Sequence, residues 1–189
     1  ISATAFAGNV EHDQTSVWKV SKGDDAVYVG GTIHILPISE FPLPATFTET
    51  YKKVDSSMQN DIAILLLPLD NPKQNALIVN ALQRTSSIIV QNSIQEGFGL
   101  TATEAMWKRK PVLVSNAAGL KFQVVHNKTG QINPDPTDIE SLSKTMAYML
   151  NHPKERDKWG FNGQLRVIQN FTLFSQLLSW LETLSKNKT

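Results

Sequence analysis

The chain contains 189 residues, of which 41% are hydrophobic and 19% are charged, a composition typical of one or two ordinary soluble domains. Its 18 Lys and Arg residues nearly balance its 17 Asp and Glu residues, so its charge gives no reason to expect nucleic acid or an anionic membrane as a partner. The lack of cysteine excludes disulfides, thiolate metal ligands and a cysteine nucleophile, and no apolar run approaches the roughly 20 residues that span a bilayer.

The first residues admit two interpretations. Ile1 to Ala7 are mostly small or apolar, and Ala5-Phe6-Ala7 has the small-x-small form of a signal-peptidase site. The stretch has no basic segment and no full apolar core. It is therefore either the tail of a signal peptide, which would place the protein in the periplasm, or a terminus rich in small residues. In both cases we treat residues 1–15 as a tail.

Two alternating runs follow, on either side of the turn Lys22-Gly23-Asp24-Asp25, and predict a β-hairpin. Further along stand Gly31-Thr32-Ile33-His34 and Phe41-Pro42-Leu43-Pro44. Through these two motifs, residues 16–56 resemble the opening of the TraB/GumN family, which is related to the Tiki-type metalloproteases. The resemblance implies an alternative function, namely a fragment of a metal-dependent hydrolase or binding module.

His34 is the single candidate metal ligand in this segment, and we predict that it binds no metal. A catalytic metal site needs about three protein ligands. The other histidines lie in no second motif of the same form; they are His12, His126 and His152. A histidine at the end of a strand more often binds an ordinary hydrogen-bond partner.

The sequence pattern changes between residues 54 and 61, which predicts a boundary between two segments. Residues 62–67 then form an apolar run ended by Pro68, as expected for a buried parallel strand. Asn71-Pro72 is typical of a helix start. We expect a second domain over residues 61–186.

A strand, a helix and a second strand are predicted in the middle of this domain. Residues 88–90 and 112–114 are short apolar runs, and the segment between them is a polar loop followed by a helix-like stretch. Such units build parallel sheets. The expected fold class is α/β, a Rossmann-like parallel sheet flanked by helices and preceded by a small β-hairpin.

The polar loop carries the residues that could bind a ligand. Gly97 and Gly99 allow the backbone to approach a ligand, and the N–H groups at the start of the following helix favour an anionic group such as a diphosphate. Glu96 and Glu104 stand eight positions apart. Each carboxylate could accept hydrogen bonds from two neighbouring sugar hydroxyls. The pattern suits a nucleotide sugar.

These residues resemble the donor-binding half of a family 4 retaining glycosyltransferase, which is built from two Rossmann-like domains. Within that family, the sequences of residues 80–84 and 104–108 most resemble the trehalose synthases that use nucleotide sugars. The matching motifs are Glu96-Gly97-Phe98-Gly99-Leu100, Glu104-Ala105-Met106, Lys110-Pro111-Val112 and Lys128-Thr129-Gly130.

The resemblance implies a role for each matching residue. Glu96 would contact the donor sugar and is the candidate catalytic residue, and Glu104 would hold the ribose. The other donor-binding candidates supply backbone N–H groups or space; they are Gly97, Phe98, Gly99 and Leu100. One alternative stays open at this point. Thr101 and Glu104 also match a capping box, in which Glu104 would only satisfy the start of a helix.

The implied function is transfer of a sugar, expected to be glucose, from a nucleoside diphosphate to a sugar acceptor in the cytoplasm. Nothing in the sequence calls for a cofactor. The family's basic pair for the diphosphate and its acceptor domain have no counterpart here, so activity of this chain alone is left open, as is an inactive hybrid of the two resemblances. We expect residues 108–110 to be a solvated helix end rather than that basic pair.

Two further helices are predicted near the end of the chain. One begins at Pro153, with Gly160 and Gly163 as weak points in it. The other covers residues 171–184, where an apolar stripe repeats at helical spacing. We expect the stripe to pack against the sheet domain. One alternative stays open: in the resembled family the final helix crosses back to the acceptor domain, and here that face would be exposed.

Overall fold

The computed structural model describes residues 3–5, 17–22, 25–30, 49, 51–53, 55–59, 65, 67 and 70–186. The chain divides into two compact units. One consists of Ile1–Leu67 and Thr137–Ala147, and the other of Pro68–Pro136 and Tyr148–Thr189.

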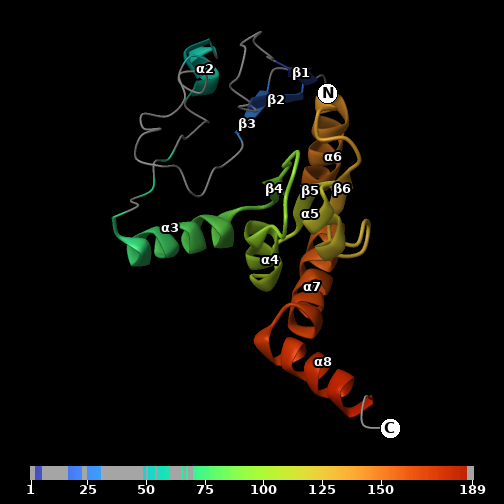
Figure 1. Ribbon diagram of the computed structural model, residues 1–189. Coiled ribbons are helices and arrows are strands. Elements are labelled where there is room, and N and C mark those ends of the chain that lie inside the picture. Colours follow the sequence, from blue (N-terminus) through green and yellow to red (C-terminus); the bar gives the residue numbers. More distant parts are fainter. Residues whose placement is uncertain are drawn as a thin grey trace. The chain divides into compact units, whose positions relative to one another are not determined.

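The first unit contains a three-stranded antiparallel sheet in the order β1-β2-β3 (Figure 1). Strands β2 (Val17–Lys22) and β3 (Asp25–Gly30) pair from Lys22 with Asp25 to Val17 with Gly30, which confirms the predicted hairpin. Strand β1 (Ala3–Ala5) lies within the predicted tail of residues 1–15 and pairs with β2. Helix α2 is Ser56–Gln59. His34 lies outside the described residues.

The second unit contains a three-stranded parallel sheet, which confirms the expected α/β class. Its strands are β4 (Ile89–Gln91), β5 (Val112–Ser115) and β6 (Gln131–Asn133), in that order. Of the strand predicted over residues 62–67, only Leu65 and Leu67 are described, and neither belongs to a strand.

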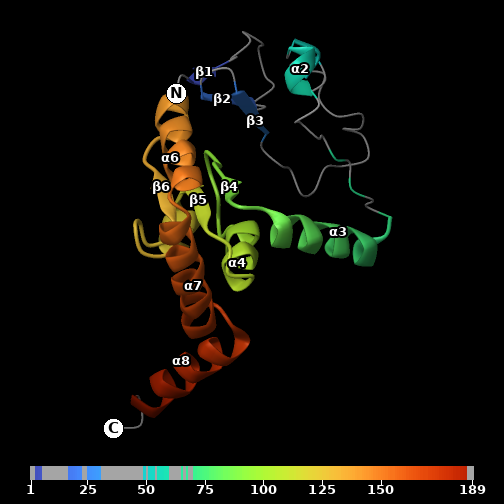
Figure 2. The ribbon, with the colours of Figure 1, turned by 180° about the vertical axis from the view of Figure 1, so that it is seen from behind.

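Further helices precede and follow the strands of this sheet along the chain. They are α3 (Pro72–Thr85), α4 (Leu100–Trp107), α5 (Ala118–Gln123), α6 (Ile139–Asn151), α7 (Pro153–Asn170) and α8 (Leu173–Lys186). Asn71 caps α3, since its side chain accepts from the Gln74 N–H at 3.1 Å. Helix α4 lies between α3 and α7 in the views from the front and from behind (Figures 1 and 2).

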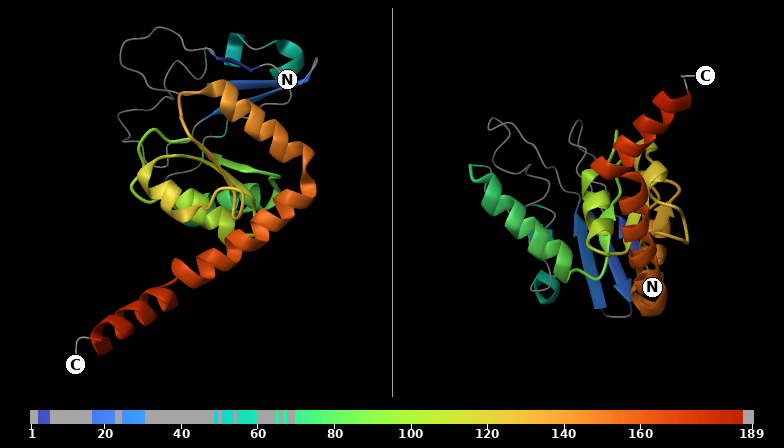
Figure 3. Two further views of the ribbon diagram at one scale, coloured as in Figure 1. Left: turned by 90° about the vertical axis from the view of Figure 1, so that its right-hand side faces the viewer. Right: turned by 90° about the horizontal axis from the view of Figure 1, so that it is seen from below.

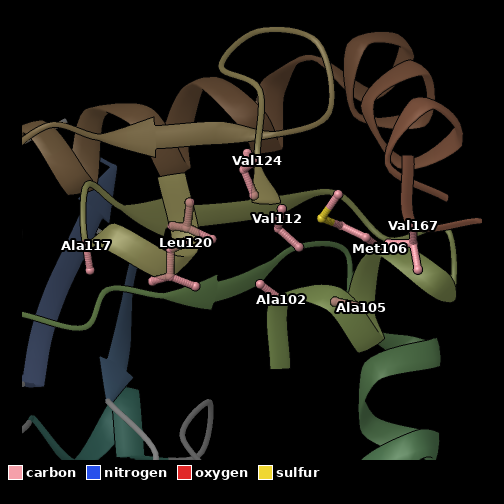
Figure 4. Close-up of a cluster of buried hydrophobic side chains, with 9 residues drawn as sticks. Ala102, Ala105, Met106, Val112, Ala117, Leu120, Val124 and Val167 are labelled. Atoms are coloured by element: carbon pink, nitrogen blue, oxygen red, sulfur yellow. The ribbon is translucent and has the colours of Figure 1, made fainter. Parts of the chain in front are cut away.

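The core of the second unit lies between β5 and helices α4, α5 and α7 (Figure 4). All four residues of β5 are buried because this strand has a neighbour on each side. The apolar side chains of this core come from several elements and form one cluster. It consists of Ala102, Ala105, Met106, Val112, Val114, Ala117, Leu120, Val124 and Val167.

Helix α7 packs closely against α4 and the loop that follows it, and two of its glycines lie at this contact. A Cβ atom on Gly160 would lie 2.4 Å from the carbonyl oxygen of Arg109, and one on Gly163 would lie 3.3 Å from Met106 Cγ. These glycines are therefore contact points within an unbroken helix, a role that the sequence did not indicate. Trp159 is buried beside them and donates from Nε1 to the Asn127 carbonyl at 3.0 Å.

The start of α7 is tied to the end of α6. The hydroxyl of Tyr148 donates to Glu155 Oε2 at 2.8 Å, and this bond raises the pKa of Tyr148 above its usual value.

Helix α8 begins and ends two residues after the predicted segment 171–184, and its packing differs from the prediction. It runs away from the sheet beyond the end of α7 (Figure 3). None of its residues is buried; Leu173 and Phe174 are each 78% exposed. The expected packing of its apolar stripe against the sheet domain is thus wrong, and the alternative of an exposed face is confirmed. No helix in the described part of the chain combines the length and apolar character that crossing a membrane requires.

Candidate functional site

The loop between β4 and α4 lies at the carboxyl end of the parallel strands, where open α/β sheets commonly bind their ligands. Gly99 is the N-cap of α4, with a left-handed φ of 89°. Thr101 is therefore the second residue of the helix rather than its cap, and the alternative of a capping box at Thr101 and Glu104 is contradicted. The carboxylate of Glu104 is not used to start the helix.

Two glycines are required by the protein's own packing. A Cβ atom on Gly99 would lie 2.4 Å from Leu120 Cδ2, in addition to the strain of the left-handed conformation. On Gly119, in α5, it would lie 2.5 Å from the carbonyl oxygen of Gly97. The Gly119 N–H also donates to the Glu96 carbonyl at 3.0 Å. Helix α5 thus supports the loop from behind.

Gly97 differs from these two glycines. A Cβ atom there would meet nothing within 4 Å, and its φ is not among the positive values found in the described residues. Neither packing nor backbone conformation within the described part of the chain demands a glycine at this position. The open space beside it is available to a ligand.

Glu96 is held by Gln91, the last residue of β4. Gln91 Nε2 donates to Glu96 Oε2 at 2.8 Å, and Gln91 Oε1 accepts from the Ala102 N–H at 3.2 Å. One amide side chain therefore ties the carboxylate to the first turn of α4. The only sign of this role in the sequence is a polar residue directly after an apolar run.

Phe98 is fixed at both its carbonyl and its ring. Its carbonyl accepts from Gln123 Nε2, and the buried Gln123 Oε1 accepts from the Thr103 hydroxyl at 2.8 Å. Its ring meets Phe171 edge to face, with 6.0 Å between the ring centroids. Gln123 was missed in the sequence, because its partners lie 20 and 25 positions away.

The first turn of α4 presents unpaired backbone donors. The first N–H groups of a helix have no partner within it; here the Ala102 and Thr103 N–H groups donate to Gln91 Oε1 and the Gly99 carbonyl. The N–H groups of Gly99 and Leu100 have no acceptor among the residues that the structure describes. The positive end of the helix dipole adds to their attraction for an anion.

Glu104 lies in the middle of α4 and contacts a cluster that the sequence did not predict. Its Oε2 accepts from Gln83 Nε2 at 3.4 Å and lies 3.9 Å from Lys108 Nζ, which also donates to Gln83 Oε1. The Lys108 side chain is only 11% exposed. The expectation of a solvated helix end at residues 108–110 is therefore wrong for Lys108.

The structure thus places all six candidate residues on one loop and the helix that follows it. No contact within the described residues joins Glu96 to Glu104, and each carboxylate has its own amide partner, Gln91 or Gln83. The residues that the structure describes contain no group of three or more His, Cys, Asp or Glu side chains that could hold a metal ion.

Comparison with known proteins places this loop in a family. The family model described as "Glycosyl transferases group 1" matches residues 72–166, half of the chain. The trehalose synthase of Thermococcus litoralis is 44% identical over 107 residues, which cover 57% of this chain and 25% of that protein. The trehalose synthase of Pyrococcus horikoshii is 37% identical over 139 residues, 74% of this chain and 32% of that protein.

The fold agrees. The structure of HepE from Anabaena in complex with UDP superposes with a TM-score of 0.64 and 20% identity, over 79% of this chain and 38% of that one. The chain spans about a quarter to a third of the length of these curated relatives. The matched region contains the sheet, the Gly97–Gly99 loop and Glu104. The chain therefore belongs to the group 1 glycosyl transferases.

Proposed function

We propose that the second unit is the donor-binding part of a retaining glycosyltransferase and binds a nucleoside-diphosphate sugar, with glucose as the sugar. The observation that carries the proposal is the open space at Gly97 beside the unpaired N–H groups of Gly99 and Leu100. A diphosphate or sugar oxygen there would gain hydrogen bonds that the described protein groups do not supply.

The two glutamates complete the proposed site. Glu96, oriented by Gln91, would accept from the donor sugar's hydroxyls, and Glu104, half exposed, would accept from the ribose. The names of the relatives support a hexose donor, since two of them are trehalose synthases. The similar structure of HepE contains UDP, which supports a nucleoside diphosphate as part of the donor.

Catalysis in such a site would be mainly electrostatic. Negative charge grows on the leaving diphosphate as the glycosidic bond breaks, and preorganised N–H donors stabilise that charge without having to reorient. The backbone of residues 98–100 is held in place by Gly99, Gln123 and Phe171, as such preorganisation requires. No step in this proposal uses a cofactor. The acceptor would be a sugar.

The test separates ligand space from fold stability at Gly97. We expect Gly97→Ala to keep the free energy of unfolding within about 0.5 kcal/mol of wild type, because its Cβ meets no described atom. We also expect it to weaken binding of UDP-, ADP- or GDP-glucose at least about tenfold, by occupying the ligand's space. Ligand-observed saturation-transfer NMR measures the binding, and urea unfolding measures the stability.

Gln95→Ala, at an exposed position in the same loop, is the matched control and should bind as wild type does. Equal donor binding by Gly97→Ala and wild type would place the ligand elsewhere. Failure of folded wild-type protein to bind any of the three sugar nucleotides would overturn the proposal.

A further inference from the structure

The cluster of Gln83, Glu104 and Lys108 is built differently from an ordinary surface ion pair. Glu and Lys at positions i and i+4 of an exposed helix contribute little to stability. Here the residue exposure of Gln83 is 4% and that of the Lys108 side chain is 11%, whereas the Glu104 side chain is 49% exposed. The amide of Gln83 and the ammonium group of Lys108 are thus largely buried, whereas the carboxylate that they contact stays accessible to solvent.

The contacts to this carboxylate are also asymmetric. Gln83 and Lys108 both approach Oε2. Oε1 has no hydrogen-bond or ion-pair partner among the described residues. One oxygen is thus held by buried groups, and the other keeps its capacity to accept hydrogen bonds from a ligand.

Lys108 and Gln83 also contact each other, so each of the three side chains in the cluster contacts the other two. Lys108 Nζ donates to Gln83 Oε1, so the amide accepts from the ammonium group while it donates to the carboxylate. Buried polar groups need such partners, and the pairing leaves each group a single favourable orientation. Because Gln83 comes from α3, the cluster also fixes α4 relative to a second helix.

We propose that Gln83 and Lys108 are positioning residues that set the Glu104 carboxylate to recognise the two ribose hydroxyls of the donor nucleotide. The inference rests on the proposed function, since it needs a nucleotide in the site. Holding Oε2 removes the rotamer freedom that Glu104 would otherwise lose on binding, so the ribose contact gains strength from preorganisation. Lys108 itself does not touch the nucleotide.

The experiment compares ribonucleotides with nucleotides that lack both hydroxyls. Dissociation constants of the full chain are measured by calorimetry for UDP, ADP and GDP and for their 2′,3′-dideoxy forms. The readout is the ratio of the dideoxy to the ribo dissociation constant for the base that binds best. This ratio is unaffected by a lower folded fraction or by a general loss of positive charge, because either changes both constants equally.

We expect a ratio of about ten or more for wild type, since hydrogen bonds to a charged group are being lost. Lys108→Met should reduce the ratio to below about three, close to that of Glu104→Ala, with unchanged dideoxy binding. Gln83→Met should do the same. Lys110→Met, the same change two positions along, should retain the wild-type ratio.

The outcomes distinguish the two proposals. A wild-type ratio near one, or no binding at all, would overturn the ribose role of Glu104 and with it this inference. A wild-type ratio of ten that persists in both Lys108→Met and Gln83→Met would overturn only the inference, and would leave the cluster a purely structural link between α3 and α4.

Discussion

Helices α7 and α8 follow one another in the chain and are both amphipathic, yet only α7 is packed. Helix α7 buries Trp159, Gly160, Gly163 and Val167, whereas α8 buries none of its residues. The two helices differ in specific contacts rather than in apolar character. Helix α7 has glycines where other backbone segments approach it, and an indole that donates to a carbonyl. An apolar stripe shows which side of a helix favours burial, but it does not show that a partner is present.

The largest effect is expected at Gly160. In a free helix, Gly→Ala stabilises by about 1 kcal/mol. In α7 the new Cβ would lie 2.4 Å from the Arg109 carbonyl oxygen, so we expect Gly160→Ala to lower the free energy of unfolding by about 2–3 kcal/mol. Urea unfolding followed by far-UV circular dichroism measures the change.

Gly163→Ala is the graded control for this substitution. Its nearest contacts are at 3.3 Å and include the flexible Met106 side chain, so its effect should be smaller. A stabilised Gly160→Ala variant would show that α7 does not lie against the Arg109 backbone in solution.

The same aromatic substitution can be made in both helices. Trp159→Phe removes the Nε1 hydrogen bond to the Asn127 carbonyl in a buried setting, and we expect a loss of about 1–2 kcal/mol. Trp180→Phe in α8, at a residue that is 62% exposed, should change the stability by less than about 0.5 kcal/mol. Thermal and urea unfolding of the two variants give the comparison directly. Equal losses would mean that the two helices are packed alike.

The smallest effect is expected on the apolar stripe of α8. Leu177 is 55% exposed, so Leu177→Gln should leave the free energy of unfolding within about 0.5 kcal/mol of wild type. Urea unfolding is again the measurement. A loss above about 1 kcal/mol would contradict the exposure of this stripe in solution.

Local patterns predicted the main features of the fold. The apolar runs of residues 88–90 and 112–114 became β4 and β5 within one residue, and Asn71-Pro72 and Pro153 begin α3 and α7. The β2–β3 hairpin forms around the predicted turn. These signals act through neighbours in the chain, so a sequence displays them. The role of the N-terminal resemblance and the domain limits of residues 16–56 and 61–186 stay predictions.

Contacts between distant residues could not be predicted in this way. Lys108 stood in a basic run that reads as a solvated helix end, and only its approach to Gln83, 25 positions earlier, withdraws it from water. Gly160 reads as a weak point until Arg109 is seen beside it. The candidate residues of the loop were found as a set, whereas the side chains that hold them, Gln91 and Gln123, were not. The donor-binding roles stay proposals.

The exposure of α8 has a consequence for local opening. A helix that buries no residue gains little from the tertiary structure, so its stability approaches that of the same 14 residues as a free peptide, a length at which helices in water are marginal. Its backbone amides would then exchange with solvent through fraying that never reaches the core. The sheet and α4 would open only with the global transition, which makes α8 a separate cooperative unit.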